Sequence, residues 1–246
     1  MSDIQINIIN KTYPAIEQAE AHTAIADLNL NLKSGEFICL VGPSGCGKTT
    51  LLNIIADLDN DYQGSIGLSQ QSVRPKIGYI FQNPRLLPWH TVRENIELVV
   101  EDPLSANIID NLLEVMQLTP SQHVYPERLS LGMSRRVAIT RAFAVDPDLL
   151  LMDEPFVSLD APTARQVRAL LLSLWQQRPH TVLFVTHDLR EAIALADRLI
   201  FLSASPMSVI SEINVPIPRA ERHDEAAIEA FRQQLLNDYP AIKELL

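Results

Sequence analysis

Residues 42–50 read Gly-Pro-Ser-Gly-Cys-Gly-Lys-Thr-Thr, a glycine-rich stretch that ends in a lysine and two threonines. The five residues before it, 37–41 (Phe-Ile-Cys-Leu-Val), form an apolar run that predicts a short buried strand. The residues after it, 51–56, have the pattern of the first turns of a helix. A strand, a glycine-rich turn and a helix in this order predict a phosphate-binding loop.

The chemistry of this stretch suits a polyphosphate. Glycines let the backbone curl so that successive N–H groups point inward, and the start of a helix adds its positive end. We expect Lys48 to reach the terminal phosphates and the hydroxyl of Thr49 to hold Mg²⁺. The alternative is a glycine-rich turn that binds nothing, which the complete pattern disfavours. The candidate nucleotide contacts are Gly42, Pro43, Ser44, Gly45, Cys46, Gly47, Lys48, Thr49 and Thr50.

Size and charge limit the class of protein. A chain of 246 residues fits one α/β domain with room for an inserted subdomain. Its formal net charge of -10 argues against a nucleic-acid binder and against direct attachment to anionic lipid. Cys39 and Cys46 have neither the spacing of a metal site nor that of a disulfide framework. Because we find no signal peptide and no apolar run near the ~20 residues of a membrane span, we expect a cytoplasmic protein.

Polar side chains follow two further predicted strands. The apolar residues 149–152 predict a strand covered on both faces, and Asp153 and Glu154 come directly after it. The strand predicted at 181–186 is followed by His187. Ligand sites of open α/β sheets lie at these carboxyl ends. We therefore expect the three side chains to be functional, against the alternatives of an accidental acidic turn and a structural histidine.

The remaining pattern alternates strands and helices. Tyr13 could stack on a purine ring, or it could be an ordinary tyrosine at the end of a strand. Residues 84–128 are punctuated by prolines and predict an inserted helical subdomain, with one apolar helix face made by Ile108, Ile109, Leu112, Leu113 and Met116. Strands are expected at 4–9, 25–32, 65–68, 76–81, 199–203 and 208–214, and helices at 135–145, after Asp160 and from Asp224.

The order of these motifs resembles that of ABC-type ATPases. The loop, Gln82, the run 129–133 (Leu-Ser-Leu-Gly-Met), Asp153-Glu154 and His187 occur in the family's order, and the resemblance covers about residues 4–204. The chain looks like the ATP-binding subunit of a bacterial ABC importer. This implies a P-loop ATPase of the α/β class, with a RecA-like parallel-sheet core, a small antiparallel β subdomain and a helical subdomain at about 84–145. The ATPase domain would span 1–215, and 216–246 would form a C-terminal helical extension.

The resemblance also implies roles for single residues. Residues 42–49 match the Walker A loop, with Lys48 among the catalytic residues, and Tyr13 matches the aromatic ring that stacks on adenine. Gln82 matches a glutamine that touches Mg²⁺ and the attacking water. Asp153 matches a Mg²⁺ partner that acts through water.

Glu154 is similar to the catalytic glutamate that polarises the attacking water, and His187 is similar to the switch histidine that senses the γ-phosphate. Asp160 lies in a segment that resembles the D-loop, which crosses to a second subunit. The cofactors implied are ATP and Mg²⁺.

The signature segment departs from the family pattern. That pattern is Leu-Ser-Gly-Gly-Gln, and this chain has Leu131 in the third place and Met133 in the fifth. In the family the segment caps the γ-phosphate bound by the opposite subunit, and Ser130 and Gly132 are retained for this contact. A methionine cannot replace the amide hydrogen bonds of glutamine, and Leu131 adds bulk. A regulatory subunit that hydrolyses ATP weakly therefore remains an alternative.

Residues 81–95 are similar to the coupling region of importers for nitrate, taurine and alkanesulfonates. The resemblance implies a head-to-tail homodimer on the inner face of the cell membrane, which works with permease subunits and, indirectly, with a periplasmic or lipid-anchored solute-binding protein. Leu87 and Trp89 would suit a groove for a permease helix if they are exposed, or they pack the helical subdomain. A soluble ABC protein that acts on nucleic acid is disfavoured by the acidic charge and the lack of tandem cassettes.

Overall fold

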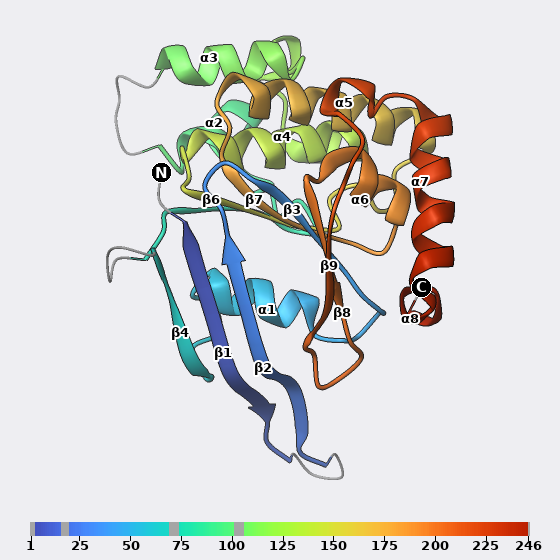
Figure 1. Ribbon diagram of the computed structural model, residues 1–246. Coiled ribbons are helices and arrows are strands. Elements are labelled where there is room, and N and C mark those ends of the chain that lie inside the picture. Colours follow the sequence, from blue (N-terminus) through green and yellow to red (C-terminus); the bar gives the residue numbers. More distant parts are fainter. Residues whose placement is uncertain (1–2, 16–19, 69–73, 101–105, 246) are drawn as a thin grey trace. The chain divides into compact units, whose positions relative to one another are not determined.

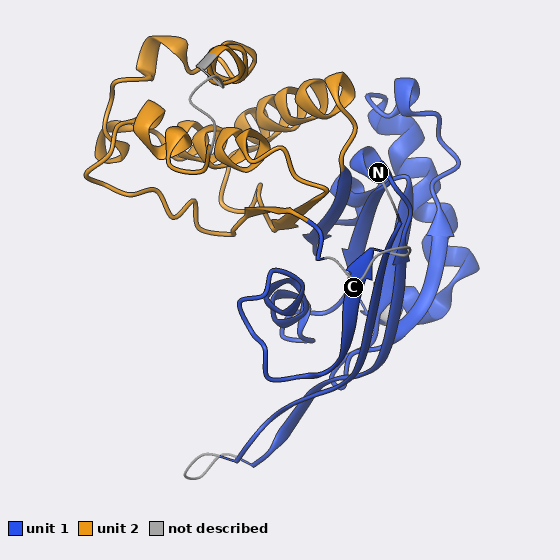
Figure 2. Ribbon diagram, turned by 90° about the vertical axis from the view of Figure 1, so that its left-hand side faces the viewer, with its two compact units in different colours: residues 1–75, 181–246 blue, residues 76–180 orange. Residues whose placement is uncertain are grey.

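The structure is a computed structural model that describes residues 3–15, 20–68, 74–100 and 106–245 (Figure 1). The chain divides into two units, which Figure 2 shows in different colours. Unit 1 holds residues 1–75 and 181–246, and unit 2 holds residues 76–180. Unit 1 is therefore built from both ends of the chain, and unit 2 is one continuous segment.

An antiparallel sheet of three strands belongs to unit 1. Its central strand, β1 (Ile4–Tyr13), pairs with β2 (His22–Leu32) on one side and with β4 (Gln63–Leu68) on the other (Figure 1). Alternate side chains at the start of β1 are buried, as the sequence pattern predicts for a half-buried strand. The strand continues past the expected end at residue 9, through a bulge between Lys11 and Thr12.

The other strands of unit 1 form the parallel part of the fold. β3 (Phe37–Val41) lies between β7 (Thr181–Thr186) and β8 (Arg198–Leu202), parallel to both, and β9 (Val209–Asn214) is antiparallel to β8. Every residue of β3 and β7 is buried, which explains their uninterrupted apolar sequences. Both strands have the bounds that the sequence predicts.

Four α-helices complete unit 1 within the described residues: α1 (Lys48–Ile55), α6 (Leu189–Leu195), α7 (Glu225–Asp238) and α8 (Pro240–Leu245), with a short 3-10 turn, η4 (Arg219–Glu221). Asp224 caps α7 by accepting a hydrogen bond from the N–H of Ala226 at 2.9 Å. The apolar face of α7 is buried as expected. It packs against α6, where Arg190 donates to Glu229 at 2.8 Å.

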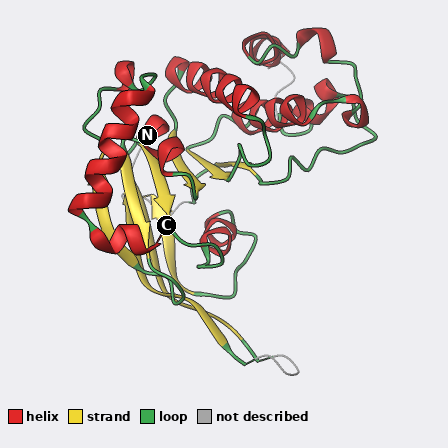
Figure 3. Cartoon of the chain, turned by 90° about the vertical axis from the view of Figure 1, so that its right-hand side faces the viewer, coloured by secondary structure: helices red, strands yellow, loops and turns green. Residues whose placement is uncertain are grey.

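Unit 2 is mostly helical, as Figure 3 shows, and contains one pair of parallel strands, β5 (Ile77–Ile80) and β6 (Leu149–Asp153). Its helices are α2 (Val92–Glu97), α3 (Ala106–Val115), α4 (Leu131–Ala144) and α5 (Ala161–Gln177), with 3-10 turns η2 (Thr119–Ser121) and η3 (Pro126–Arg128).

Two expectations for unit 2 are wrong in detail. Ile108 does not belong to the buried face of α3, because it is 56% exposed, whereas Ile109, Leu113 and Met116 are buried. The helix expected from residue 135 begins at Leu131, since the hydroxyl of Ser130 accepts the N–H of Met133 and caps it there. The apolar periodicity of α4 is weak, so its start could not be found from the pattern.

A buried asparagine organises the loop before α2. Asn95 is fully buried, and its side-chain oxygen accepts the N–H of Leu87 at 2.8 Å. Its side-chain nitrogen donates to the carbonyl oxygens of Leu87, His90 and Thr91 at 2.9–3.1 Å. The amide thus pairs the N–H of Leu87 and the carbonyl oxygen of His90, adds a second hydrogen bond to the carbonyl oxygens of Leu87 and Thr91, and ties residues 87–91 to the start of α2.

We predict that Asn95→Ala lowers the free energy of unfolding by about 3 kcal/mol, because it removes a buried side chain that pairs the N–H of Leu87 and the carbonyl oxygen of His90. Urea unfolding would measure the loss. The matched control is Asn111→Ala, at an exposed position of α3, which we expect to change stability by less than about 0.5 kcal/mol. Equal losses in the two variants would contradict the role given to Asn95.

We expect the buried His180 to make the stability of the fold depend on pH. Its Nδ1 lies 2.9 Å from the carbonyl oxygen of Pro147, and its ring packs edge-on against Phe143. Trp175 donates its indole N–H to the backbone oxygen of His180 at 2.8 Å. Burial lowers the pKa of His180 below its ordinary value of 6.5. The folded protein therefore binds a proton at this site less readily than the unfolded chain does.

Stability contributed in this way is present above the ordinary pKa and is lost as the pH falls below it. We predict that His180→Gln reduces the loss of stability between about pH 7.5 and pH 5.5 relative to the unmodified protein. Urea midpoints at the two pH values would measure the difference. An unchanged pH dependence in the variant would rule out His180 as its source.

Candidate phosphate-binding site

The glycine-rich loop curls between β3 and α1. Gly45 and Gly47 have φ angles of 78° and 110°, values that side chains with a Cβ rarely adopt. A Cβ on Gly42 would approach the sulfur of Cys46 and the side chain of Leu202 at 3.2 Å. The glycines therefore allow a loop whose backbone turns sharply and packs closely against β8.

Lys48, the first residue of α1, is buried inside this curl. Its ammonium group donates to the carbonyl oxygens of Gly42 at 2.8 Å and Pro43 at 2.7 Å, and lies 3.8 Å from the sulfur of Cys46. None of these three acceptors is a carboxylate. The positive charge is thus held in place without being neutralised, which suits an anion.

The start of α1 adds to this preference for an anion. Its N-cap is Gly47, which offers no side-chain oxygen to the first N–H groups of the helix. Ser44, Gly45 and Thr49 are exposed around the buried Lys48. Backbone donors, a helix N-terminus and a held ammonium together fit the phosphates of a nucleotide.

Unit 1 also brings Tyr13 and His187 to this loop. The hydroxyl of Tyr13 lies 3.1 Å from the hydroxyl of Thr50, in the first turn of α1. Parallel pairing places Val41 opposite Thr186, so the loop and His187 leave the sheet at the same end. The N–H of Asp188 donates to the hydroxyl of Thr186 at 3.1 Å, which fixes the turn that carries His187.

Unit 2 gathers a second group of the predicted residues. Ile80 pairs with Met152, so Gln82 and Glu154 follow their strands at the same edge. The side-chain nitrogen of Gln82 donates to Oε2 of Glu154 at 3.4 Å, and Asp153 is buried. Glu154 has a φ of 43°, an uncommon conformation for a residue with a side chain and one that recurs at functional sites.

Ser130, Gly132 and Asp160 have structural roles in unit 2. Ser130 caps α4, and Asp160 caps α5 by accepting the N–H of Thr163 at 3.1 Å. The hydrogen bond from Thr163 lowers the pKa of Asp160. A Cβ on Gly132 would lie 2.6 Å from the methyl group of Thr163, so a larger residue here would require the Thr163 side chain or the helices to shift.

Sequence reasoning missed the residues that hold the segment around Gln82. Arg135 donates to the carbonyl oxygen of Phe81 at 2.9 Å, and Arg141 donates to those of Pro84 and Arg85 at 2.9 and 3.0 Å. Burial lowers the pKa of both arginines. The basic start of the helix expected at 135–145 was the signal that could have pointed to them.

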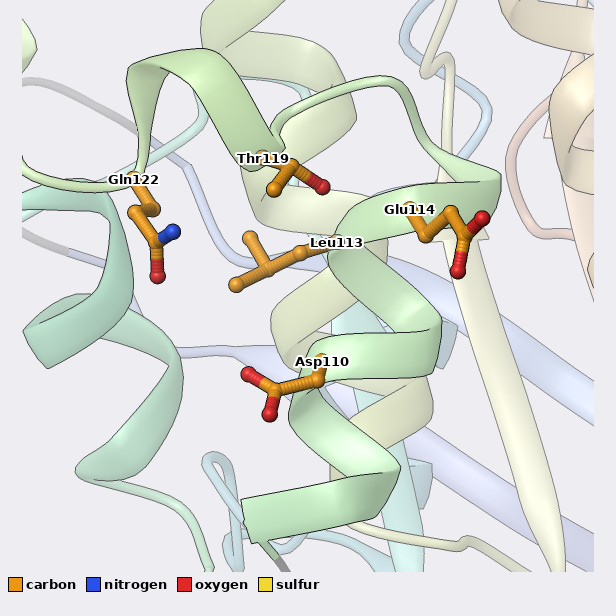
Figure 4. A pocket seen from close by; sticks show the side chains of 5 residues that line it. All are labelled: Asp110, Leu113, Glu114, Thr119 and Gln122. Carbon is orange, nitrogen blue, oxygen red and sulfur yellow. The ribbon is translucent and has the colours of Figure 1, made fainter.

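A hollow of about 560 Å³ lies in unit 2 and is lined by none of the predicted site residues. Figure 4 shows that three of its lining side chains come from α3 and two from the segment that follows it. Arg93 donates to Asp110 at 2.7 Å and to Gln122 at 2.8 Å, so these two polar side chains of the hollow are already paired. The lining residues are Asp110, Leu113, Glu114, Thr119 and Gln122, and none is a predicted site residue.

The described part of the chain shows neither a membrane-spanning helix nor a cluster of metal-binding side chains. Across residues 3–15, 20–68, 74–100 and 106–245, no helix has both the length and the apolar character needed to cross a membrane. In the same ranges, no three His, Cys, Asp or Glu side chains cluster in a way that could hold a metal ion.

Known proteins resemble this chain over most of its length. The aliphatic sulfonates import ATP-binding protein SsuB of Bacillus subtilis (strain 168) is 38% identical over 98% of this chain and 96% of its own. The nitrate import ATP-binding protein NrtD of Synechococcus elongatus is 39% identical over 92% of this chain and 85% of its own. The dimeric structure of MJ0796, a bacterial ABC transporter cassette, is 32% identical, covers 87% of this chain and 100% of its own, and has a TM-score of 0.74.

The solved cassette shares the α/β architecture described above, which confirms the predicted fold class. The family model described as "ABC transporter" matches residues 25–157, which include the glycine-rich loop, Gln82, Ser130 and Glu154. On the similarity of these sequences and the fold together, the chain belongs to the ABC transporter family.

Proposed function

We propose that this chain is the ATP-binding and ATP-hydrolysing subunit of an importer for a small solute such as an aliphatic sulfonate, taurine or nitrate. ATP hydrolysis is the general activity of the family, and the relatives named above are import subunits for sulfonates and nitrate. The observation that carries the proposal is the ammonium of Lys48, held by two carbonyl oxygens of a curled loop. This arrangement supports the binding of a polyphosphate.

Hydrolysis is a phosphoryl transfer to water, which needs mainly positioning and charge stabilisation. In this proposal Lys48 and the loop N–H groups neutralise the phosphate oxygens. Glu154 polarises the attacking water, Gln82 helps to orient it, and His187 contacts the γ-phosphate. The hydrogen bond from Gln82 to Glu154 supports a shared task for these two residues.

A divalent cation fits the oxygen donors that the chain offers. Thr49, Gln82 and Asp153 supply a hydroxyl, an amide oxygen and a carboxylate, the ligand types that Mg²⁺ prefers. Bound Mg²⁺ would supply further positive charge to the phosphate oxygens. The task of the protein is to present these oxygens to the ion.

We further propose that two copies close head to tail around two ATP molecules. Ser130 and Gly132 would then face the γ-phosphate held by the other copy, and the segment with Asp160 would cross between the subunits. Because Ser130 caps α4 as an acceptor, its hydroxyl hydrogen stays available to donate to a phosphate. The dimeric form of the solved cassette supports this assembly.

The partner in the membrane would be a permease, with a solute-binding protein acting through it. Trp89 is 68% exposed and Leu87 is half-buried, on the loop that Asn95 holds rigid. A rigid loop with an exposed indole suits a groove for a permease helix. The proposed location is therefore peripheral, on the inner face of the cell membrane. The helical subdomain would span about 84–145 of an ATPase domain at 1–215, followed by the extension at 216–246.

One observation favours a second candidate, a regulatory subunit that hydrolyses ATP weakly. Leu131 is 43% exposed at the start of α4, next to the donors of Ser130 and Gly132. An exposed leucine there would hinder close approach of a phosphate from another subunit. Steady-state ATP hydrolysis, measured with and without the permease, would separate the two candidates.

Lys48→Met should weaken the binding of ATP with magnesium by about 10- to 100-fold, because it removes charged hydrogen bonds to phosphate. Isothermal titration calorimetry would measure the affinity. Lys33→Met, which removes an exposed lysine of unit 1, is the matched control and should bind normally. Retained affinity in Lys48→Met would refute the phosphate-binding assignment.

Glu154→Gln should keep ATP binding and lower the hydrolysis rate by about 10²- to 10⁴-fold, because the amide cannot accept a proton from water. Release of phosphate would be the measurement, and light scattering should detect a dimer trapped with ATP. Glu127→Gln, at an exposed position of unit 2, serves as the control. Normal turnover in Glu154→Gln would exclude it as the catalytic carboxylate.

A further inference from the structure

A buried lysine lies over the ring of Tyr13. Lys11 is 2% exposed, and its ammonium lies 4.7 Å from the centroid of the Tyr13 ring. The same ammonium donates to Oδ1 of Asp59 at 2.9 Å and to the carbonyl oxygen of Asp61 at 2.7 Å. Asp59 and Asp61 lie in the turn that follows α1. This turn therefore anchors the lysine, and the lysine contacts one face of the ring.

The tyrosine is held a second time at its hydroxyl. That oxygen lies 3.1 Å from the hydroxyl of Thr50, in the first turn of α1. Tyr13 is nevertheless 41% exposed. Because Lys11 covers one face of the ring, the exposed area belongs to the rest of its surface. The ring is thus fixed at two points beside the phosphate loop and remains accessible.

The surroundings of Lys11 favour the charged form of its side chain. Burial on its own would lower its pKa, but the hydrogen bond that it donates to Asp59 and the negative charges of Asp59 and Asp61 outweigh that influence and raise the pKa above its ordinary value of 10.5. The ammonium is attracted to the negative face of the ring, an interaction that strengthens as water is excluded. The bulge between Lys11 and Thr12 redirects the strand at this point, as bulges near functional sites do.

We propose that Lys11, anchored by Asp59, is a positioning residue that holds Tyr13 as a platform for the base of the nucleotide. The inference rests on the proposed binding of ATP and assigns base recognition to the chain Asp59–Lys11–Tyr13–Thr50, separate from the grip of Lys48 on the phosphates. Lys11 acts through the ring and touches no part of the nucleotide itself. Its loss should therefore matter for a ligand with a base and not for a bare triphosphate.

The test is a double-mutant cycle measured by calorimetry with MgATP. Tyr13→Leu should weaken ATP binding about tenfold, and Lys11→Met about three- to fivefold. The double variant should match Tyr13→Leu alone, because Lys11 has nothing to position once the ring is gone. Multiplicative losses in the double variant would overturn the inference. Magnesium tripolyphosphate, which lacks a base, should bind all three variants as it binds the unmodified protein.

Control variants separate positioning from folding. Asp59→Asn leaves the lysine in place but loosens its anchor, and it should weaken ATP binding in the same direction while tripolyphosphate binding stays unchanged. Lys33→Met should change neither. Equal losses for ATP and tripolyphosphate in Lys11→Met and Asp59→Asn would show a general structural defect and overturn the inference. Unchanged ATP affinity in Tyr13→Leu would also overturn the inference, because the ring would then not support the base. The proposed binding of ATP is tested separately by Lys48→Met.

Discussion

In a loop that binds phosphate, the lysine must not form an ion pair with a carboxylate of its own chain. In this chain the constraint is met by two backbone carbonyls, those of Gly42 and Pro43, which hold the ammonium of Lys48 at 2.7–2.8 Å without cancelling its charge. The geometry needs the left-handed glycines of the loop and the buried strand β3 that presents it. Everything proposed for Tyr13, His187 and Glu154 depends on a phosphate being held at this point.

Several candidate site residues also act as helix caps. Ser130 and Asp160 each accept an N–H from the first turn of the helix that they begin, and Asp188, next to His187, does the same for α6. A side chain that caps a helix has a fixed rotamer, so the functional group beside it is positioned without further support. Exposed loops thus gain fixed geometry from the helices that they precede.

The elements that could be predicted are those with a strong local pattern. The apolar runs at β3 and β7, and the helix starts at Asp160 and Asp224, were expected from neighbouring residues alone. Arg135 could not be expected, because it donates to the backbone of Phe81, which is distant in the sequence. Asn95 and Lys11 act on groups nearby in the chain, but through irregular loop and bulge geometry that leaves no periodic pattern. The same holds for Ile108, whose exposure depends on which face α3 turns inward. Strand ends identified the candidate site residues, but not what holds them.

Because Gly132 lies against Thr163, the positions of the signature segment differ in how freely their side chains can be changed. An added methyl group at residue 132 would clash with the Thr163 side chain, whereas Leu131 is 43% exposed and Met133 contributes its backbone N–H to the cap. In the proposed head-to-tail assembly, exchange of the two flanking side chains would therefore change the affinity of one copy for the nucleotide of the other while leaving the close contact between α4 and α5 in place.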